Sequence, residues 1–198
     1  MKLPHILDLH PTQFVLGTKE IESKITKITA FNKKELQAYC SDHRIPVVIG
    51  PKQELYMIDH HHFARTCWEL NISSYLIKIV KDLSNKNEKD FWNFMIDKEW
   101  VYLNDQFGMG PHSPDALPND IRCLADDPFR SLAWAIVDAG FIKKKTIPFF
   151  EFKWAAFFRR NLNVPLHSKS NFKTAIDLAK KLARSAAAKD LPGFIVSR

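Results

Sequence analysis

Three consecutive histidines (His60, His61 and His62) follow Asp59 in the segment YMIDHHHFART, which covers residues 56–66 (the histidine box). The apolar residues before Asp59 predict a strand, and aspartate is a favourable N-cap for a helix that starts directly after it. The first turn of a helix carries free backbone N–H groups and the positive end of the helix dipole, so it attracts anions. We therefore predict a phosphate site where this strand meets this helix.

Helical spacing gathers polar side chains of the histidine box on one face of the predicted helix. His62, Arg65 and Thr66 share that face, and Phe63 and Cys67 share an apolar one. A helix start whose histidines contact only solvent is the alternative interpretation. The residues predicted to bind phosphate or nucleotide here are His60, His61, His62, Arg65 and Thr66.

A metal site is a further alternative for these residues. His61 and His62 are adjacent and diverge by about 100° on a helix, so the two do not easily share one metal ion. Asp59 is the candidate additional ligand. Asp126 and Asp127 could hold Mg²⁺, which prefers carboxylate oxygens, and their alternative role is a helix cap at the surface.

Glu20 and Lys24 are four residues apart on another predicted helix. As a pair that only stabilises this helix, they would contribute a few tenths of a kcal/mol, about 0.2–0.5. The functional interpretation makes Glu20 a general base and Lys24 a phosphate ligand beside the histidine box. Glu151, within an aromatic cluster, is either exposed or functionally placed.

The composition is that of an ordinary globular protein, with 198 residues, 45% apolar residues and a net charge of +7. It predicts one large domain, or a domain with an appendage, and excludes disordered, collagen-like and coiled-coil chains. No apolar run approaches the roughly 20 residues of a membrane helix, and no signal peptide is evident. Three scattered cysteines favour a reducing compartment. We expect a cytoplasmic protein that has no membrane partner.

Positive charge is concentrated near the C-terminus. Residues 143–198 carry a net charge of +10, and residues 1–142 carry −3. Such an excess is typical of a surface that binds a phosphate polymer, so nucleic acid is a candidate partner of the basic C-terminal helix. A solvated helix face is the alternative.

Periodicity and capping residues predict an α/β fold followed by helices. Residues 1–83 form the α/β core, residues 84–166 a helical part packed on it, and residues 167–198 a basic helix and tail. The strand at 75–80 is expected to run parallel to the strand at 54–58 through a right-handed crossover. The predicted strands cover 12–16, 45–49, 54–58 and 75–80. The predicted helices cover 19–30, 34–40, 60–70, 88–97, 128–140, 150–160 and 170–187.

Five segments together resemble the ParB/sulfiredoxin superfamily, and most closely its "putative ParB-like nuclease" family. The segments are HPTQ at 10–13 with Gly17, Glu20 and Lys24; PVVIGP at 46–51; the histidine box; DDPFRSLAW at 126–134; and FEFKWA at 150–155. The resemblance implies a small mixed sheet with helices, and a nucleotide or phosphate held at the box.

The box departs from the superfamily pattern in informative ways. Superfamily boxes usually carry glycine at the position of His60 and arginine at that of Phe63. Sulfiredoxins have their catalytic cysteine at the position of His61, so the resemblance does not imply peroxiredoxin repair. The CTP-hydrolysing partition proteins have Glu-Arg-Arg at residues 61–63, so a CTP clamp is not implied. The free-serine kinases have a more similar box, and their N-terminal glutamate corresponds best to Glu20.

These observations favour a nucleotide-binding enzyme that acts on phosphate esters, either a phosphotransferase or a nucleotide hydrolase. Glu20, Asp59 and His61 are its predicted catalytic residues, and Mg²⁺ with ATP or another nucleotide is the predicted cofactor. A metal-dependent nuclease and a non-catalytic nucleotide-binding module are the alternatives. Whether the protein turns over a substrate stays open at this point.

Overall fold

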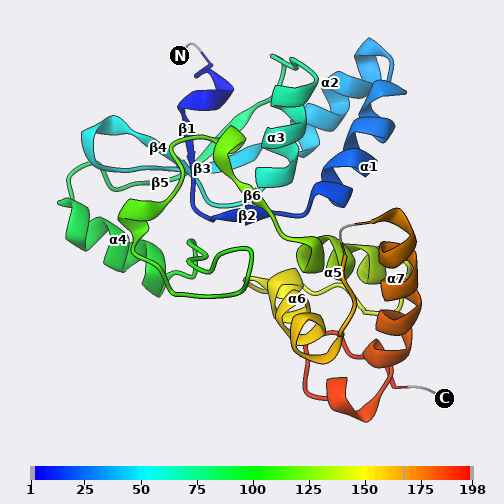
Figure 1. The fold of residues 1–198 in the computed structure, drawn as a ribbon. Helices are drawn as coiled ribbons and strands as arrows, with labels where there is room; N and C mark the ends of the chain where they lie inside the picture. Colours follow the sequence, from blue (N-terminus) through cyan, green and yellow to red (C-terminus); the bar gives the residue numbers. More distant parts are fainter. Residues whose placement is uncertain (1–2, 167, 197–198) are drawn as a thin grey trace. The chain divides into compact units, whose positions relative to one another are not determined.

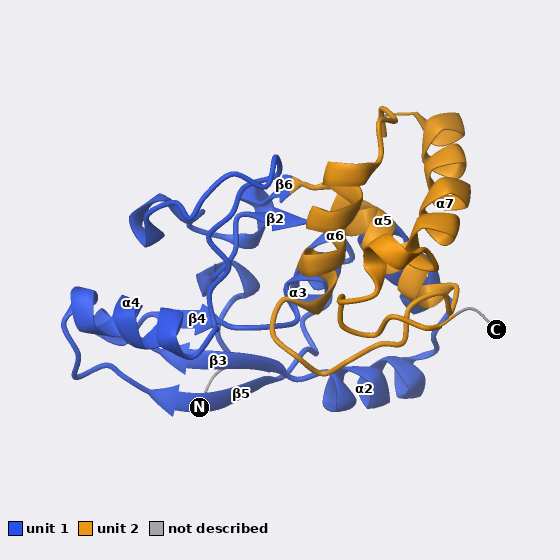
Figure 2. Cartoon of the chain, turned by 90° about the horizontal axis from the view of Figure 1, so that it is seen from below, with its two compact units in different colours: residues 1–16, 21–125 blue, residues 17–20, 126–198 orange. Residues whose placement is uncertain are grey.

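The computed structural model describes residues 3–166 and 168–196. These residues form two compact units (Figure 2): residues up to 16 together with 21–125, and residues 17–20 together with 126 onward. The sequence predicted a boundary near residue 83. In the structure the chain beyond this point packs back on the sheet, because Phe91, Met95 and Val101 form one buried cluster with Val48.

The first unit contains a four-stranded mixed sheet in the order β1-β4-β3-β5 (Figure 1). Its strands are β1 (Leu9–Pro11), β3 (Ile45–Ile49), β4 (Leu55–Met57) and β5 (Ile77–Asp82). β4 is parallel to β1 and antiparallel to β3, whereas β5 is parallel to β3. The small mixed sheet is thus confirmed. The expected parallel orientation of the strands at 54–58 and 75–80 is wrong: β5 pairs in parallel with the far edge of β3, and β3 is antiparallel to β4.

Both faces of this sheet are covered. Alternate side chains of a strand point to opposite faces, and accordingly Val47 and Met57 belong to one buried cluster while Val48 and Tyr56 belong to another. The first cluster also contains Phe63, and the second contains residues of the helix α4. The helices that contribute to the first unit are α1 (Thr18–Thr29, from residue 21), α2 (Lys33–Asp42), α3 (His61–Glu69) and α4 (Glu88–Asp97).

The segment 103–119 is an extended loop, as its glycines and prolines predict. The Asp105 carboxylate orders one turn of it by accepting the backbone N–H groups of Phe107 and Met109, each at 2.9 Å. Short elements around the loop complete the first unit. They are η1 (Ile6–Asp8), β2 (Val15–Leu16), η2 (Pro51–Gln53), η3 (Pro114–Ala116), η4 (Ile121–Cys123) and the first residue of β6 (Ala125–Asp126), whose Asp126 belongs to the second unit.

The second unit is helical. Its aromatic residues form the core, with Trp154 and Phe158 fully buried against Leu132 and Ile136. The helix start at Asp127 is confirmed, since the Asp127 carboxylate accepts the Phe129 N–H at 2.9 Å. Its elements are α5 (Pro128–Asp138), α6 (Phe150–Asn161), α7 (Lys169–Ala183) and η5 (Ala186–Ala188). Within residues 3–166 and 168–196, every helix is too short or too polar to cross a bilayer.

Candidate phosphate-binding site

The histidine box forms the junction between β4 and α3. His60 is the N-cap residue of α3, and no side chain caps this helix. The prediction that Asp59 caps the helix is wrong: Asp59 lies one residue too early, and its Oδ1 accepts the backbone N–H of His60 at 2.6 Å. The N-cap side chain of α3 therefore does not supply the acceptor that is preferred at helix starts.

His60 gives this junction its backbone shape. Its φ of 63° and ψ of 23° lie in the left-handed region, and the right-handed residues of α3 follow directly. A left-handed residue followed by right-handed ones turns successive backbone N–H groups toward one point, which makes a concavity for an anion. Glycine adopts such a φ at no steric cost. This explains why glycine is usual in similar boxes at the position that His60 occupies.

His61 connects the start of α3 to the end of β1. Its Nε2 accepts the backbone N–H of Thr12 at 3.1 Å, and the Thr12 hydroxyl donates to the Met57 carbonyl at 2.8 Å. Burial, helped by the neighbouring His60, lowers the pKa of His61 to about 4, although Asp59 and the Met57 carbonyl act in the opposite direction. His61 is therefore neutral at pH 7. It positions two strands and a helix and does not supply a positive charge.

Arg65 and Thr66 hold the chain together beside the junction. Arg65 Nε lies 2.8 Å from a Glu69 oxygen, and its Nη1 donates to the Ile121 carbonyl at 3.3 Å. The guanidinium also covers the ring of Trp68, 5.0 Å from its centroid. The Thr66 hydroxyl donates to the His62 carbonyl one helical turn earlier. Both side chains, predicted from the sequence as phosphate ligands, have protein partners in the structure.

The other two histidines flank the junction. The Nδ1 atom of His60 lies 3.3 Å from the His43 carbonyl, and the His43 ring stacks on Tyr39 at 3.8 Å. His62 is buried, with 8% of its surface exposed. Both imidazoles thus lie at the start of α3, beside its first turn.

The predicted acids outside the box belong to the second unit. Asp126 Oδ1 accepts the Thr18 N–H at 3.0 Å. Asp127 is buried and pairs with Arg159 at 2.6 Å; burial raises its pKa, and Arg159 opposes that shift. Among residues 3–166 and 168–196, no group of three or more His, Cys, Asp or Glu side chains is arranged to hold a metal ion. Lys24 belongs to the first unit.

Glu20 is part of a buried ion cluster that the sequence did not predict. Its Oε2 lies 3.1 Å from Nη2 of Arg130, and Glu151 Oε2 lies 4.0 Å from the same nitrogen. Arg130 is buried, with only 6% of the residue exposed. Its position three residues before the buried Ala133, on the apolar face of α5, was the signal in the sequence.

Comparison with known proteins identifies the class. A family model described as "Putative ParB-like nuclease" matches residues 4–160, so the chain belongs to this ParB-like family. The structure is similar to the crystal structure of protein Atu1540 from Agrobacterium tumefaciens, with a TM-score of 0.89 and 35% sequence identity over 98% of this chain and 97% of that chain. The ParB-like α/β fold is thereby confirmed. A search of curated proteins found no match.

Proposed function

We propose that the protein binds a nucleotide, or another phosphate ester, with a phosphate group at the N-terminus of α3. One observation carries this proposal: α3 has no side-chain cap and starts from the left-handed residue His60. An anion in this concavity would satisfy backbone donors and face the positive end of the helix dipole. Membership of the family described as "Putative ParB-like nuclease" supports the same class of ligand, since nucleases act on phosphodiesters.

The residues of the site suggest how the charge of a bound phosphate ester would be stabilised there. Fixed backbone donors stabilise negative charge that develops on phosphate oxygens, which is a main source of catalysis in phosphoryl transfer. The described residues offer no cluster of three metal-binding side chains. The Mg²⁺ that we predicted would therefore be held mainly by the phosphates of the nucleotide, where it neutralises their charge. Glu20 engages Arg130 in the second unit and is not part of the proposed binding site.

The Asp59→Asn variant is expected to bind ATP or CTP about fivefold more tightly than wild type in the absence of Mg²⁺. The amide oxygen still accepts the His60 N–H, but a negative charge beside the phosphate is removed, and two charges 4 Å apart in water interact by about 1 kcal/mol. Isothermal titration calorimetry measures the difference. Asp82→Asn is the matched control, since Asp82 also accepts a backbone N–H, that of Ser84, and is exposed.

Two results would contradict the proposal. One is the absence of nucleotide binding by wild type and both variants. The other is an equal gain for Asp59→Asn and Asp82→Asn, which would show only the change in net charge. If Asp59→Asn weakens binding when Mg²⁺ is present, Asp59 holds the metal ion, as the sequence analysis considered.

A nuclease is the second candidate function, and the basic surface of α7 favours it. Lys169, Lys173 and Lys181 are exposed on this helix. Arg184, the C-cap residue of this helix, donates to the Ile195 and Gly140 carbonyls at 3.2 and 3.4 Å. The structure therefore offers fewer free cations on α7 than the sequence suggested.

Replacing the three exposed α7 lysines with glutamine is expected to remove most of the non-specific DNA binding. Three phosphate contacts on duplex DNA correspond to a slope of about −2.7 for log affinity against log salt, and glutamine keeps the helix propensity. Fluorescence anisotropy at several salt concentrations measures the slope. Lys33, Lys34 and Lys89 are exposed in the first unit, and their glutamine variant is the control with the same net charge. An equal loss in both variants would contradict a role for α7.

A further inference from the structure

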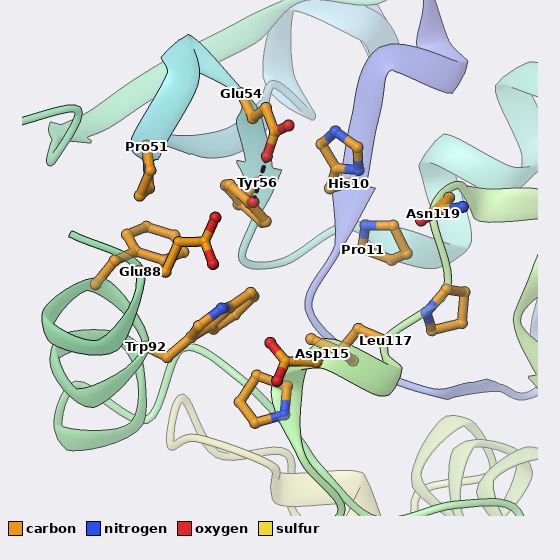
Figure 3. Close-up of a pocket in the computed structure, with 13 residues that line it drawn as sticks. His10, Pro11, Pro51, Glu54, Tyr56, Glu88, Trp92, Asp115, Leu117 and Asn119 are labelled. Atoms are coloured by element: carbon orange, nitrogen blue, oxygen red, sulfur yellow. Dashed lines mark hydrogen bonds between the residues drawn. The ribbon is translucent and has the colours of Figure 1, made fainter. Parts of the chain in front are cut away.

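A cleft of about 210 Å³ lies in the first unit and shares only Tyr56 with the histidine box (Figure 3). Its wall is formed by the β4 side chain Tyr56 and by Phe91 and Trp92 of α4, and prolines complete it. Tyr56 and Trp92 meet edge to face, with their ring centroids 5.3 Å apart. The lining residues are His10, Pro11, Pro51, Glu54, Tyr56, Glu88, Phe91, Trp92, Pro114, Asp115, Leu117, Pro118 and Asn119.

The charged groups of the cleft are all acidic. Glu54, Glu88 and Asp115 come from three separate segments, and the described lining residues include neither lysine nor arginine. In Figure 3 the carboxylates of Glu88 and Asp115 lie near the indole of Trp92. The cleft therefore combines an aromatic surface with negative charge contributed by different parts of the fold.

Tyr56 holds the carboxylate of Glu54, the third acidic group of the cleft, in position. Its hydroxyl donates to Glu54 Oε2 at 2.7 Å, as the dashed line in Figure 3 marks. Burial and the Glu54 carboxylate raise the pKa of Tyr56, so the phenol keeps its proton and the hydrogen bond persists at neutral pH. The His10 ring lies against the same tyrosine, with a centroid distance of 5.3 Å.

One cation of the chain already contacts the rim. Lys52 Nζ lies 2.8 Å from Glu88 Oε1, and both side chains are largely exposed, at 71% and 64%. An exposed ion pair of this kind contributes little stability, so a ligand can replace it at small cost. Lys52 thus competes with any cationic ligand for Glu88.

We propose that this cleft binds a small organic cation, a guanidinium or ammonium group on a short aliphatic chain, against Trp92 and between the carboxylates of Glu88 and Asp115. A cation over an indole face gains cation–π attraction, and a planar guanidinium matches a carboxylate with two parallel hydrogen bonds. The volume suits one group of side-chain size. The site is separate from the phosphate site and does not depend on it.

Agmatine, which carries a guanidinium and an ammonium group, is the probe for calorimetric titration of the full chain. Glu88→Gln and Asp115→Asn are each expected to weaken its binding about tenfold. Lys52→Ala is expected to strengthen binding several-fold, because the competing ammonium is removed. Glu22→Gln, an exposed helix position of the first unit, is the control and leaves binding unchanged. Thermal melts confirm that each variant is folded.

The opposite effects of Lys52→Ala and Glu88→Gln distinguish binding from loss of the surface ion pair, since a merely structural pair would give effects of the same sign. N-butylurea, a neutral analogue, is expected not to bind. A blocked Gly-Arg-Gly peptide tests the source of the cation: tighter binding than agmatine indicates a protein side chain, and weaker binding a free small molecule. No agmatine binding at millimolar concentration, or equal binding of N-butylurea, would overturn the proposal.

Discussion

The Arg130→Met variant is expected to be about 3–5 kcal/mol less stable than wild type, the usual cost of leaving buried charges without their partner. The Arg130 guanidinium lies close to the carboxylates of both Glu20 and Glu151, and the side chains of Arg130 and Glu20 are 7% and 13% exposed. Its guanidinium also covers Phe152, 5.4 Å from the ring centroid. Urea denaturation measures the loss of unfolding free energy.

A triple variant separates charge from packing. Arg130→Met combined with Glu20→Gln and Glu151→Gln removes the cluster as a whole, and replacing a complete buried ion cluster is often nearly neutral. We expect the triple variant to recover most of the stability lost in Arg130→Met. A triple variant as unstable as the single one would show that Arg130 acts through its aliphatic packing. The Nε and Nη1 atoms of Arg130 are buried and have no protein hydrogen-bond partner among the described residues. Packing alone therefore does not account for a buried guanidinium at this position.

Acidification from pH 7 to pH 4 is expected to cost wild type about 3 kcal/mol through His61 alone. The folded pKa of His61 is about 4, against 6.5 as the ordinary value. Below pH 6.5 His61 binds a proton in the unfolded chain but stays neutral in the folded chain, so acid favours unfolding. The stability associated with neutral His61 is complete above pH 6.5 and is lost as the pH falls to the folded pKa of His61.

The His61→Gln variant isolates this effect from the other titrating groups. A glutamine oxygen can still accept the Thr12 N–H but has no proton to gain in this range. Urea denaturation of both proteins at several pH values gives the difference in their unfolding free energies. We expect this difference to change by about 3 kcal/mol between neutral pH and pH 4. Wild type is the more stable protein at neutral pH, and His61→Gln becomes relatively more stable toward pH 4. Parallel pH profiles would contradict a buried neutral His61.

Local signals determined much of the secondary structure. Asn87 and Asp127 cap α4 and α5, because each side chain accepts a backbone N–H two or three residues later. Asn71 and Gly140 follow the ends of their helices in left-handed conformations. Such features depend on a few neighbouring residues, so they can be predicted from the sequence. The junction of a strand and a helix at the histidine box was also predicted, although not the way this helix starts, and the resemblance to the ParB-like family implied the small mixed sheet.

Long-range contacts decided what the histidine box can do. The sequence indicated a row of cationic ligands, but Thr12, 49 residues before His61, makes this histidine a buried neutral acceptor. Likewise the carbonyl of Ile121 engages Arg65. The type of a residue sets which groups it can bind, whereas its burial and its partners set its charge and its free donors. Those depend on segments far apart in the sequence, and only the tertiary structure brings them together.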